Sequence, residues 1–136
     1  MRIGLVFYFF CFLLNGIQAQ SLQSLDDLQP PAEYDNVHLE RIDGDSLSTS
    51  FVIWIKQEVT PHYHEYHSEQ VLVLSGTALM KLGEKELKIK ANDLIFIPAQ
   101  TIHSVKVTSK EPLKVLSIQS PEFKGKDRIL VEEETK

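Results

Sequence analysis

The chain has 136 residues, of which 43% are hydrophobic and 24% are charged, so its length and composition match one small globular domain. Its formal net charge of -5 leaves no basic footprint for a nucleic acid, and we expect no nucleic-acid partner. The single cysteine, Cys11, excludes an intrachain disulfide.

Residues 1–19 have the pattern of a secretory signal peptide. Arg2 supplies a positive start, Leu5–Leu14 is an apolar run, and Ala19 is a small residue suited to cleavage. We therefore expect a periplasmic or secreted protein with no membrane contact after cleavage; the alternative is an uncleaved N-terminal anchor. Because Cys11 leaves with the signal, the mature chain has no thiol that could act as a metal ligand or nucleophile.

Residues 20–36 form an N-terminal leader with little strand character. Leu22, Leu25 and Leu28 recur every third residue, which is compatible with a short amphipathic turn or helix that ends at Pro30-Pro31. We expect this segment to lie on the domain or to stay mobile.

Residues 37–120 read as a β domain. Short runs rich in Val, Ile, Leu and Phe alternate with turn signals, and no long stretch has helical periodicity, so an all-β sandwich or barrel is predicted. Residues 56–61 read as a connection, and the last two strands as a pair. The expected strands are 37–42, 49–55, 70–74, 78–82, 86–90, 94–97, 102–107 and 113–118.

The C-terminal tail, residues 121–136, is charged at its end but contains several apolar side chains. We expect these side chains to pack on this barrel or on a neighbouring chain. They are Phe123, Ile129, Leu130 and Val131.

A run of histidines precedes the 70–74 strand. His62 and His64 are two residues apart, so an extended strand would place both imidazoles on one face. Glu69 follows at the start of a Val/Leu run, and a turn would bring its carboxylate beside the two rings. Imidazole nitrogens with one carboxylate oxygen suit Fe, Mn, Ni, Co or Zn.

The order His62-x-His64, four residues, Glu69, six residues, Gly76 resembles the first motif of the cupin family. The stretch 92–103, which ends at His103, resembles the second cupin motif, and the spacer 77–91 is similar to that of small single-domain microbial cupins. The resemblance covers roughly residues 37–119.

The resemblance implies a double-stranded β-helix, also called a cupin or jelly-roll barrel. It also implies that His62, His64, Glu69 and His103 hold one divalent transition metal ion, either Fe, Mn, Ni or Zn. Glu65 and Gln70 do not fit the spacing of the oxygen ligand. The sequence departs from the family pattern only at turn and framework positions, namely Lys56, Asn92, Gln100 and Val107; Asn tolerates the positive φ that a turn requires.

The barrel is expected to enclose a pocket lined by Val71 and Val73, which share the strand face of Glu69, and by Val105, which shares that of His103. Trp54 or Phe51 is a further candidate for the lining. The alternative is an exposed histidine-rich loop without a metal.

We expect four further polar side chains to have roles other than metal binding. We expect His67 to be a surface or rim residue, His38 to be structural, and Tyr63 to pack away from the rings. Glu58 is a candidate general base.

The resemblance implies a metal-dependent enzyme, either a dioxygenase or a sugar isomerase or lyase, that acts on a small polar metabolite. The alternatives are a non-catalytic module that binds sugar or metal, and a structural protein stabilised by its metal. Family resemblance also implies a homodimer. Apolar side chains suited to cover a sheet edge on the partner chain are Leu22, Leu25, Phe123 and Ile129.

Overall fold

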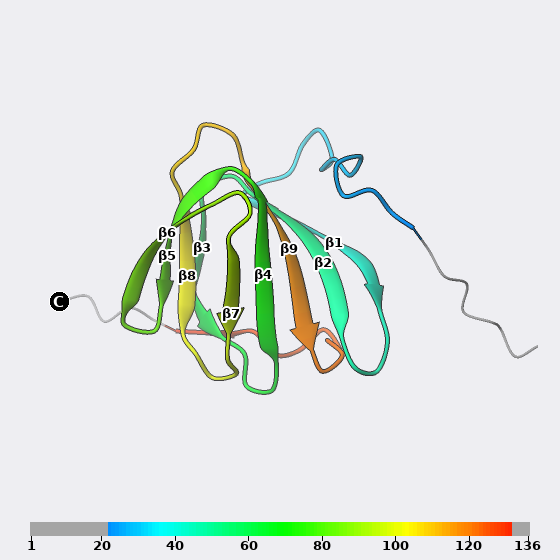
Figure 1. Cartoon of the computed structure of the whole chain (residues 1–136). Helices are drawn as coiled ribbons and strands as arrows, with labels where there is room; N and C mark the ends of the chain where they lie inside the picture. Colours follow the sequence, from blue (N-terminus) through cyan, green and yellow to red (C-terminus); the bar gives the residue numbers. More distant parts are fainter. Residues whose placement is uncertain (1–21, 132–136) are drawn as a thin grey trace, which may run out of the picture.

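The computed structural model describes residues 22–131, so the predicted signal peptide lies outside the described residues. This part of the chain forms ten β-strands and no helix of the length and apolarity needed to cross a membrane (Figure 1). The strands are β1 Val37–Gly44, β2 Thr49–Ile55, β3 Glu58–Tyr63, β4 Ser68–Ser75, β5 Thr77–Leu82, β6 Lys85–Lys90, β7 Leu94–Ile97, β8 His103–Val107, β9 Leu113–Ser120 and β10 Ile129–Leu130.

The strands form two antiparallel five-stranded sheets, in the orders β1-β2-β9-β4-β7 and β10-β3-β8-β5-β6. Side chains that alternate along each strand meet between the sheets and form the core. The all-β class is confirmed.

The inner faces of the two sheets supply a buried apolar cluster that includes Ile55, Val73, Met80, Ile97 and Leu113. In β6, the alternation of Leu87 and Ile89 with lysines places Ile89 in this core and leaves Lys88 and Lys90 in solvent. This strand therefore has one buried and one solvated face, as its sequence predicts.

Two expectations about the strands are wrong, one about which strands pair and one about a connection. The strands β8 and β9 do not pair, because β8 lies between β3 and β5 while β9 lies between β2 and β4 in the other sheet. The predicted connection 56–61 is largely the strand β3, in which a register shift between Val59 and His62 accommodates Pro61. Proline has no N–H for the ladder and weakens the strand signal.

The leader residues described, 22–36, contact the outer face of the first sheet. Lys114 of β9 donates hydrogen bonds from Nζ to the carbonyls of Leu25 and Leu28, at 2.6 and 2.9 Å. The ring of His38 lies between Tyr34 and Trp54, with centroid separations of 6.0 and 5.6 Å. Trp54 is buried by these contacts on the outer face, away from the space between the sheets.

Candidate metal centre

Four side chains that the sequence singles out come together at one end of the space between the sheets. His62 lies near the end of β3, Glu69 near the start of β4 and His103 at the start of β8, while His64 follows β3 directly. Antiparallel pairing brings these strand ends to the same side, and β3 and β8 place His62 opposite His103. All four side chains are buried, with 5–6% of their surface exposed.

Backbone carbonyls fix the orientation of three imidazoles. The Nδ1 atoms of His62 and His103 lie 2.9 Å from the carbonyls of Thr60 and Thr101, and Nδ1 of His64 lies 2.9 Å from that of Asp127. A carbonyl only accepts, so each Nδ1 carries the proton and donates. The Nε2 atom of each ring is therefore the one left for a ligand.

The ring nitrogens of His62, His64 and His103 converge on a common point, with one ligand atom from each ring within 4.8 Å of the others. The His62 and His103 rings are 4.2 Å apart between centroids. Three imidazoles in this arrangement match the donor sets that hold Fe, Mn, Ni or Zn, and fit a metal site.

Glu69 lies beside the triad and contacts two of its members. Its Oε2 atom is 3.5 Å from Nε2 of both His64 and His103, and its Oε1 atom accepts a hydrogen bond from the hydroxyl of Ser117. Burial raises the pKa of Glu69, but the nearby rings of His103 and His64 and the hydrogen bond from Ser117 outweigh burial and lower the pKa below its ordinary range. The carboxylate is thus ionised and one oxygen faces the triad.

The surroundings shift the pKa values of two histidines in opposite directions. Burial, with the nearby His103 ring, lowers the pKa of His62 to about 4, so this imidazole is neutral near pH 7. Burial also acts to lower the pKa of His64, but the hydrogen bond and charge of Glu69 outweigh it and raise that pKa above 6.5. At Nε2 of His64 a proton and a metal ion would therefore compete.

His67 is buried, with 5% of its surface exposed, and the expectation of a surface or rim residue is wrong. Its Nδ1 bonds Asp127 Oδ2 through a short contact, and its Nε2 lies 3.0 Å from the carbonyl of Glu122. Both ring nitrogens are engaged, so His67 is not part of the triad. The alternation of an extended strand predicts an outward side chain for His67. That prediction is wrong because the chain turns between β3 and β4, and the C-terminal segment covers the turn.

The buried carboxylate of Asp127 organises this turn. It accepts hydrogen bonds from the backbone N–H groups of Glu65, Tyr66 and His67, at 2.9 to 3.1 Å, as well as from the His67 ring. Burial raises the pKa of Asp127, but the hydrogen bonds from His67 and the backbone outweigh it and lower that pKa. Together with its carbonyl on His64, Asp127 ties residues 64–67 to the C-terminal segment.

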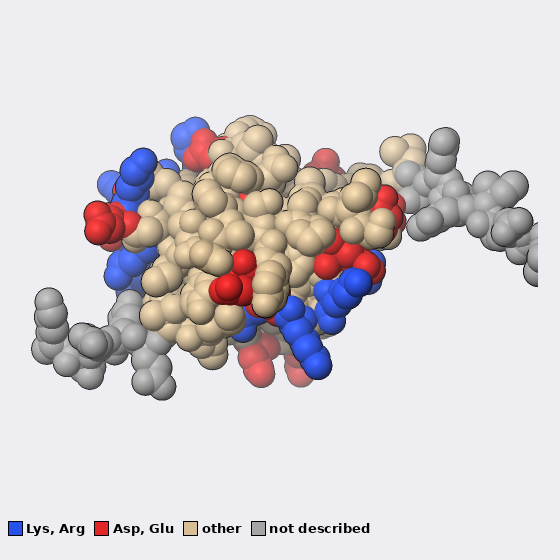
Figure 2. All heavy atoms as spheres, turned by 90° about the horizontal axis from the view of Figure 1, so that it is seen from below, with Lys and Arg blue, Asp and Glu red and all other residues tan. Residues whose placement is uncertain are grey.

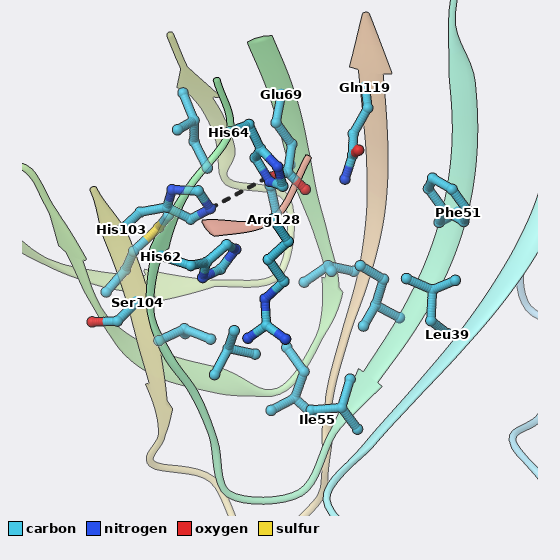
Figure 3. A pocket seen from close by; sticks show the side chains of 18 of the residues that line it. Leu39, Phe51, Ile55, His62, His64, Glu69, His103, Ser104, Gln119 and Arg128 are labelled. Atoms are coloured by element: carbon cyan, nitrogen blue, oxygen red, sulfur yellow. Dashed lines mark ion pairs between the residues drawn. The ribbon is translucent and has the colours of Figure 1, made fainter. Parts of the chain in front are cut away.

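A cavity of about 200 Å³ extends from the histidine triad between the sheets (Figure 3). Its most exposed lining residues are Val37 and Leu39 of the edge strand β1, at 42% and 48%, and Arg128 beside the edge strand β10. The cavity therefore opens to solvent between these two edges. From below the molecule of Figure 1, uncharged atoms fill most of the surface and charged groups lie mainly at its margin (Figure 2).

Some of the residues predicted to line the cavity do so, and others lie elsewhere. Phe51, Val71 and Val105 line it, whereas Trp54 lies on the outer face of the sheet and Val73 is fully buried in the core. Glu58 is exposed and does not line the cavity.

Sequence reasoning missed Ser117, Gln119, Asp127 and Arg128. Ser117 and Gln119 share strand parity with the apolar Leu113 and Val115 of β9, and this alternation could have placed them inside. Asp127 and Arg128 lie in a charged segment whose sequence does not indicate a position beside the histidines, because only the fold brings that segment there.

Known proteins resemble this chain in both sequence and fold. An uncharacterized protein of Aquifex aeolicus is 36% identical over 84 residues, which cover 62% of this chain and 69% of that protein. The mannose-1-phosphate guanylyltransferase RfbM of Salmonella typhimurium is 39% identical over 67 residues, 49% of this chain but only 14% of the enzyme.

Among solved structures, an uncharacterized conserved protein with a double-stranded β-helix domain from Klebsiella pneumoniae superposes with a TM-score of 0.71 at 20% identity. The match covers 85% of this chain and all of that one, and confirms the double-stranded β-helix. The family profile of the cupin domain matches residues 50–119, which include all three histidines of the triad and Glu69. The chain therefore belongs to the cupin family.

Proposed function

We propose that this protein is a metal-dependent enzyme with one divalent transition metal ion held by His62, His64, His103 and Glu69. The observation that carries the proposal is the convergence of three buried imidazoles beside the carboxylate of Glu69, each with its Nδ1 atom 2.9 Å from a backbone carbonyl. The cavity next to this group opens to solvent and has room for several water-sized groups, since one water occupies about 30 Å³ in the liquid. A site of purely structural role is usually closed.

A bound divalent ion would supply a Lewis acid that polarises an oxygen of the substrate. Protein groups around it would orient the substrate and exclude water, because most of the lining is apolar. Two reaction types are compatible with this arrangement: oxygen insertion, which needs a redox-active metal, and proton transfer in a small carbonyl or sugar-like substrate, which also works with Zn.

A second candidate is a non-catalytic module that binds a small molecule through the same centre. The observation in its favour is the composition of the lining. Besides the three triad histidines and Glu69, the only other titratable side chain among the described residues that line the cavity is Arg128, which is always protonated. An acid or base separate from the metal ligands is thus lacking there.

Metal content of the purified protein tests the proposal. We expect near-stoichiometric Fe, Mn, Ni or Zn by mass spectrometry, and its loss in His62→Ala and His103→Ala. The matched control is His38→Ala, which removes an imidazole from the outer face and should leave the metal content unchanged. A protein that neither contains nor takes up any of these metals would contradict the metal site.

The predicted signal peptide supports a periplasmic or secreted location for the proposed activity. The mass of the intact protein recovered from its native host, compared with that calculated from the full sequence, tests this part. Loss of roughly the first 19 residues is expected, and a full-length cytoplasmic protein would contradict it.

A further inference from the structure

The cavity has a polar and an apolar region. Its polar groups belong to the triad, Glu69, Ser104, Gln119 and Arg128, whereas the rest of the lining consists of aliphatic side chains, Phe51, Met80 and Phe123. A ligand that fills this space would bury an apolar body against both sheets and present polar atoms to the few groups that can bond them.

Gln119 is a buried amide without a partner inside the cavity. Its side chain extends from β9 into the cavity beside Glu69 (Figure 3), and only 6% of its surface is exposed. The Oε1 atom has no hydrogen-bond partner among the described residues. A buried amide oxygen without a partner costs free energy. A ligand hydroxyl, or a water held by a ligand, would remove that cost.

Arg128 directs a charged group into the same cavity. Its guanidinium lies beyond His62, toward Ile55 (Figure 3), and no carboxylate of residues 22–131 forms an ion pair with it. The residues before and after Arg128 are both held in place. Asp127 is hydrogen-bonded to residues 65–67, and β10, which begins at Ile129, pairs with β3. The planar guanidinium of arginine binds carboxylates through two parallel hydrogen bonds.

The charge in the cavity adds to this argument. Once the proposed divalent ion is bound, its two positive charges and that of Arg128 face only one negative charge, that of Glu69. Excess positive charge in a largely apolar cavity favours an anionic ligand. This step rests on the proposed metal site, whereas the placement of Arg128 and Gln119 does not.

We propose that the pocket binds a small molecule that carries a carboxylate on an apolar body, with the carboxylate held by Arg128; Gln119 can in addition accept a hydrogen bond from a donor that such a ligand carries. The apolar body lies against the aliphatic walls contributed by β1, β2 and β9. Arg128 thus selects for the anionic group, and the triad contacts another part of the ligand.

Calorimetric titration with hexanoate, hexanamide and acetate tests this proposal on the full protein, both metal-loaded and after treatment with a chelator. Hexanamide lacks the charge, and acetate lacks the apolar body. We expect hexanoate to bind about tenfold or more tightly than hexanamide, the range of a hydrogen-bonded charge pair, and more tightly than acetate.

Arg128→Gln should remove the preference for hexanoate over hexanamide, and Arg128→Lys should retain part of it. The control Arg41→Gln removes an arginine that does not line the cavity and should keep the preference. Equal binding of hexanoate and hexanamide, no binding of hexanoate at millimolar concentration, or a preference that survives Arg128→Gln would each overturn the proposal. A preference for hexanoate in a protein that neither contains nor takes up a metal would support the carboxylate site and contradict only the proposed metal centre.

Discussion

At the scale of single residues, the centre depends on which nitrogen of each histidine carries the proton. His62 and His103 each donate from Nδ1 to the carbonyl of a threonine two residues earlier, Thr60 and Thr101. This local contact recurs on two paired strands and leaves both Nε2 atoms on the inner side. His64 needs a carbonyl from the distant Asp127 to reach the same state, so its orientation depends on the tertiary fold.

The first prediction concerns the pH dependence of metal affinity. The pKa of His62 is about 4, so its imidazole needs no deprotonation near neutrality, whereas the raised pKa of His64 means that a proton must leave its Nε2 first. As pH falls below the His64 pKa, the affinity for Zn²⁺ should drop by about tenfold per pH unit, the effect of one competing proton.

Competition titrations with a metal-sensitive dye at several pH values measure this slope. His38→Asn is the control, since it alters a histidine on the outer face, outside the triad, and should leave the slope unchanged. An affinity that does not vary between neutral pH and pH about 5 would contradict the role given to His64.

Asp127 supplies the second prediction at this scale. Asp127→Ala leaves three backbone N–H groups and the His67 ring without their acceptor, and should lower the free energy of unfolding by about 3 kcal/mol. Asp127→Asn keeps the size and one acceptor oxygen, and should cost less.

The sign of the pH effect follows from the lowered pKa of Asp127. Its stabilising contribution is fully present above the unfolded value of about 3.9 and is lost as pH falls through the lower folded value. The difference in urea-unfolding free energy between the wild type and Asp127→Asn should thus be constant near neutrality and shrink below pH about 4. A difference that grows in acid would contradict this assignment.

At the scale of elements, the C-terminal segment 121–131 connects the two sheets across the end that holds the histidines (Figure 1). Phe123 packs edge-on against Phe51, at 5.7 Å between ring centroids, and contacts the ring of His67. Ile129 and Leu130 form β10 on the edge of β3, and the N–H of Val131 bonds the carbonyl of Pro61 at 3.0 Å. Phe123 and Ile129 therefore contact their own barrel.

Truncation tests the role of this segment. A chain that ends at Ser120 loses Asp127 and Arg128, and should bind metal at least about tenfold more weakly because a supporting contact of a ligating histidine is gone. A chain that ends at Val131 is the matched control and should bind as the full chain does. Equal metal affinity of all three, measured on folded protein, would show that the segment does not orient His64.

Element boundaries were easiest to predict where the alternation is regular. The strand predicted at 49–55 coincides with β2, and that at 94–97 coincides with β7. At two positions that depart from the family pattern, Asn92 and Gln100, the backbone has φ of 72° and 64°. Asn is one of the residues that tolerate such a φ, whereas Gln is not. The strand β3 was missed because Pro61 and a register shift interrupt its pattern, and β10 because two residues carry too little signal.

At the scale of the whole molecule, the first sheet has an outer face that the leader covers only in part. Leu94 and Phe96 of β7 are 67% and 58% exposed on an edge strand, which leaves their side chains and one row of backbone groups open. We propose that a second copy of the chain covers this region, as expected for a homodimer.

Light scattering at micromolar concentration should give the mass of a dimer. Phe96→Glu places a charge in the proposed interface and should shift the equilibrium to the monomer, while Lys88→Glu on the solvated face of β6 should not. A wild-type protein that remains monomeric at these concentrations would contradict the homodimer.

The sequence by itself determined the all-β class and most strand positions, because strand periodicity is a property of short stretches. It also singled out His62, His64 and Glu69 by their spacing, and His103 through the resemblance of its motif to the cupin family. Only the tertiary structure decided which sheet each strand joins, the burial of His67, and the arrival of Asp127 and Arg128 beside the histidines. These features depend on contacts between segments some 60 residues apart, and local propensity carries no information about which distant segment will cover a given turn.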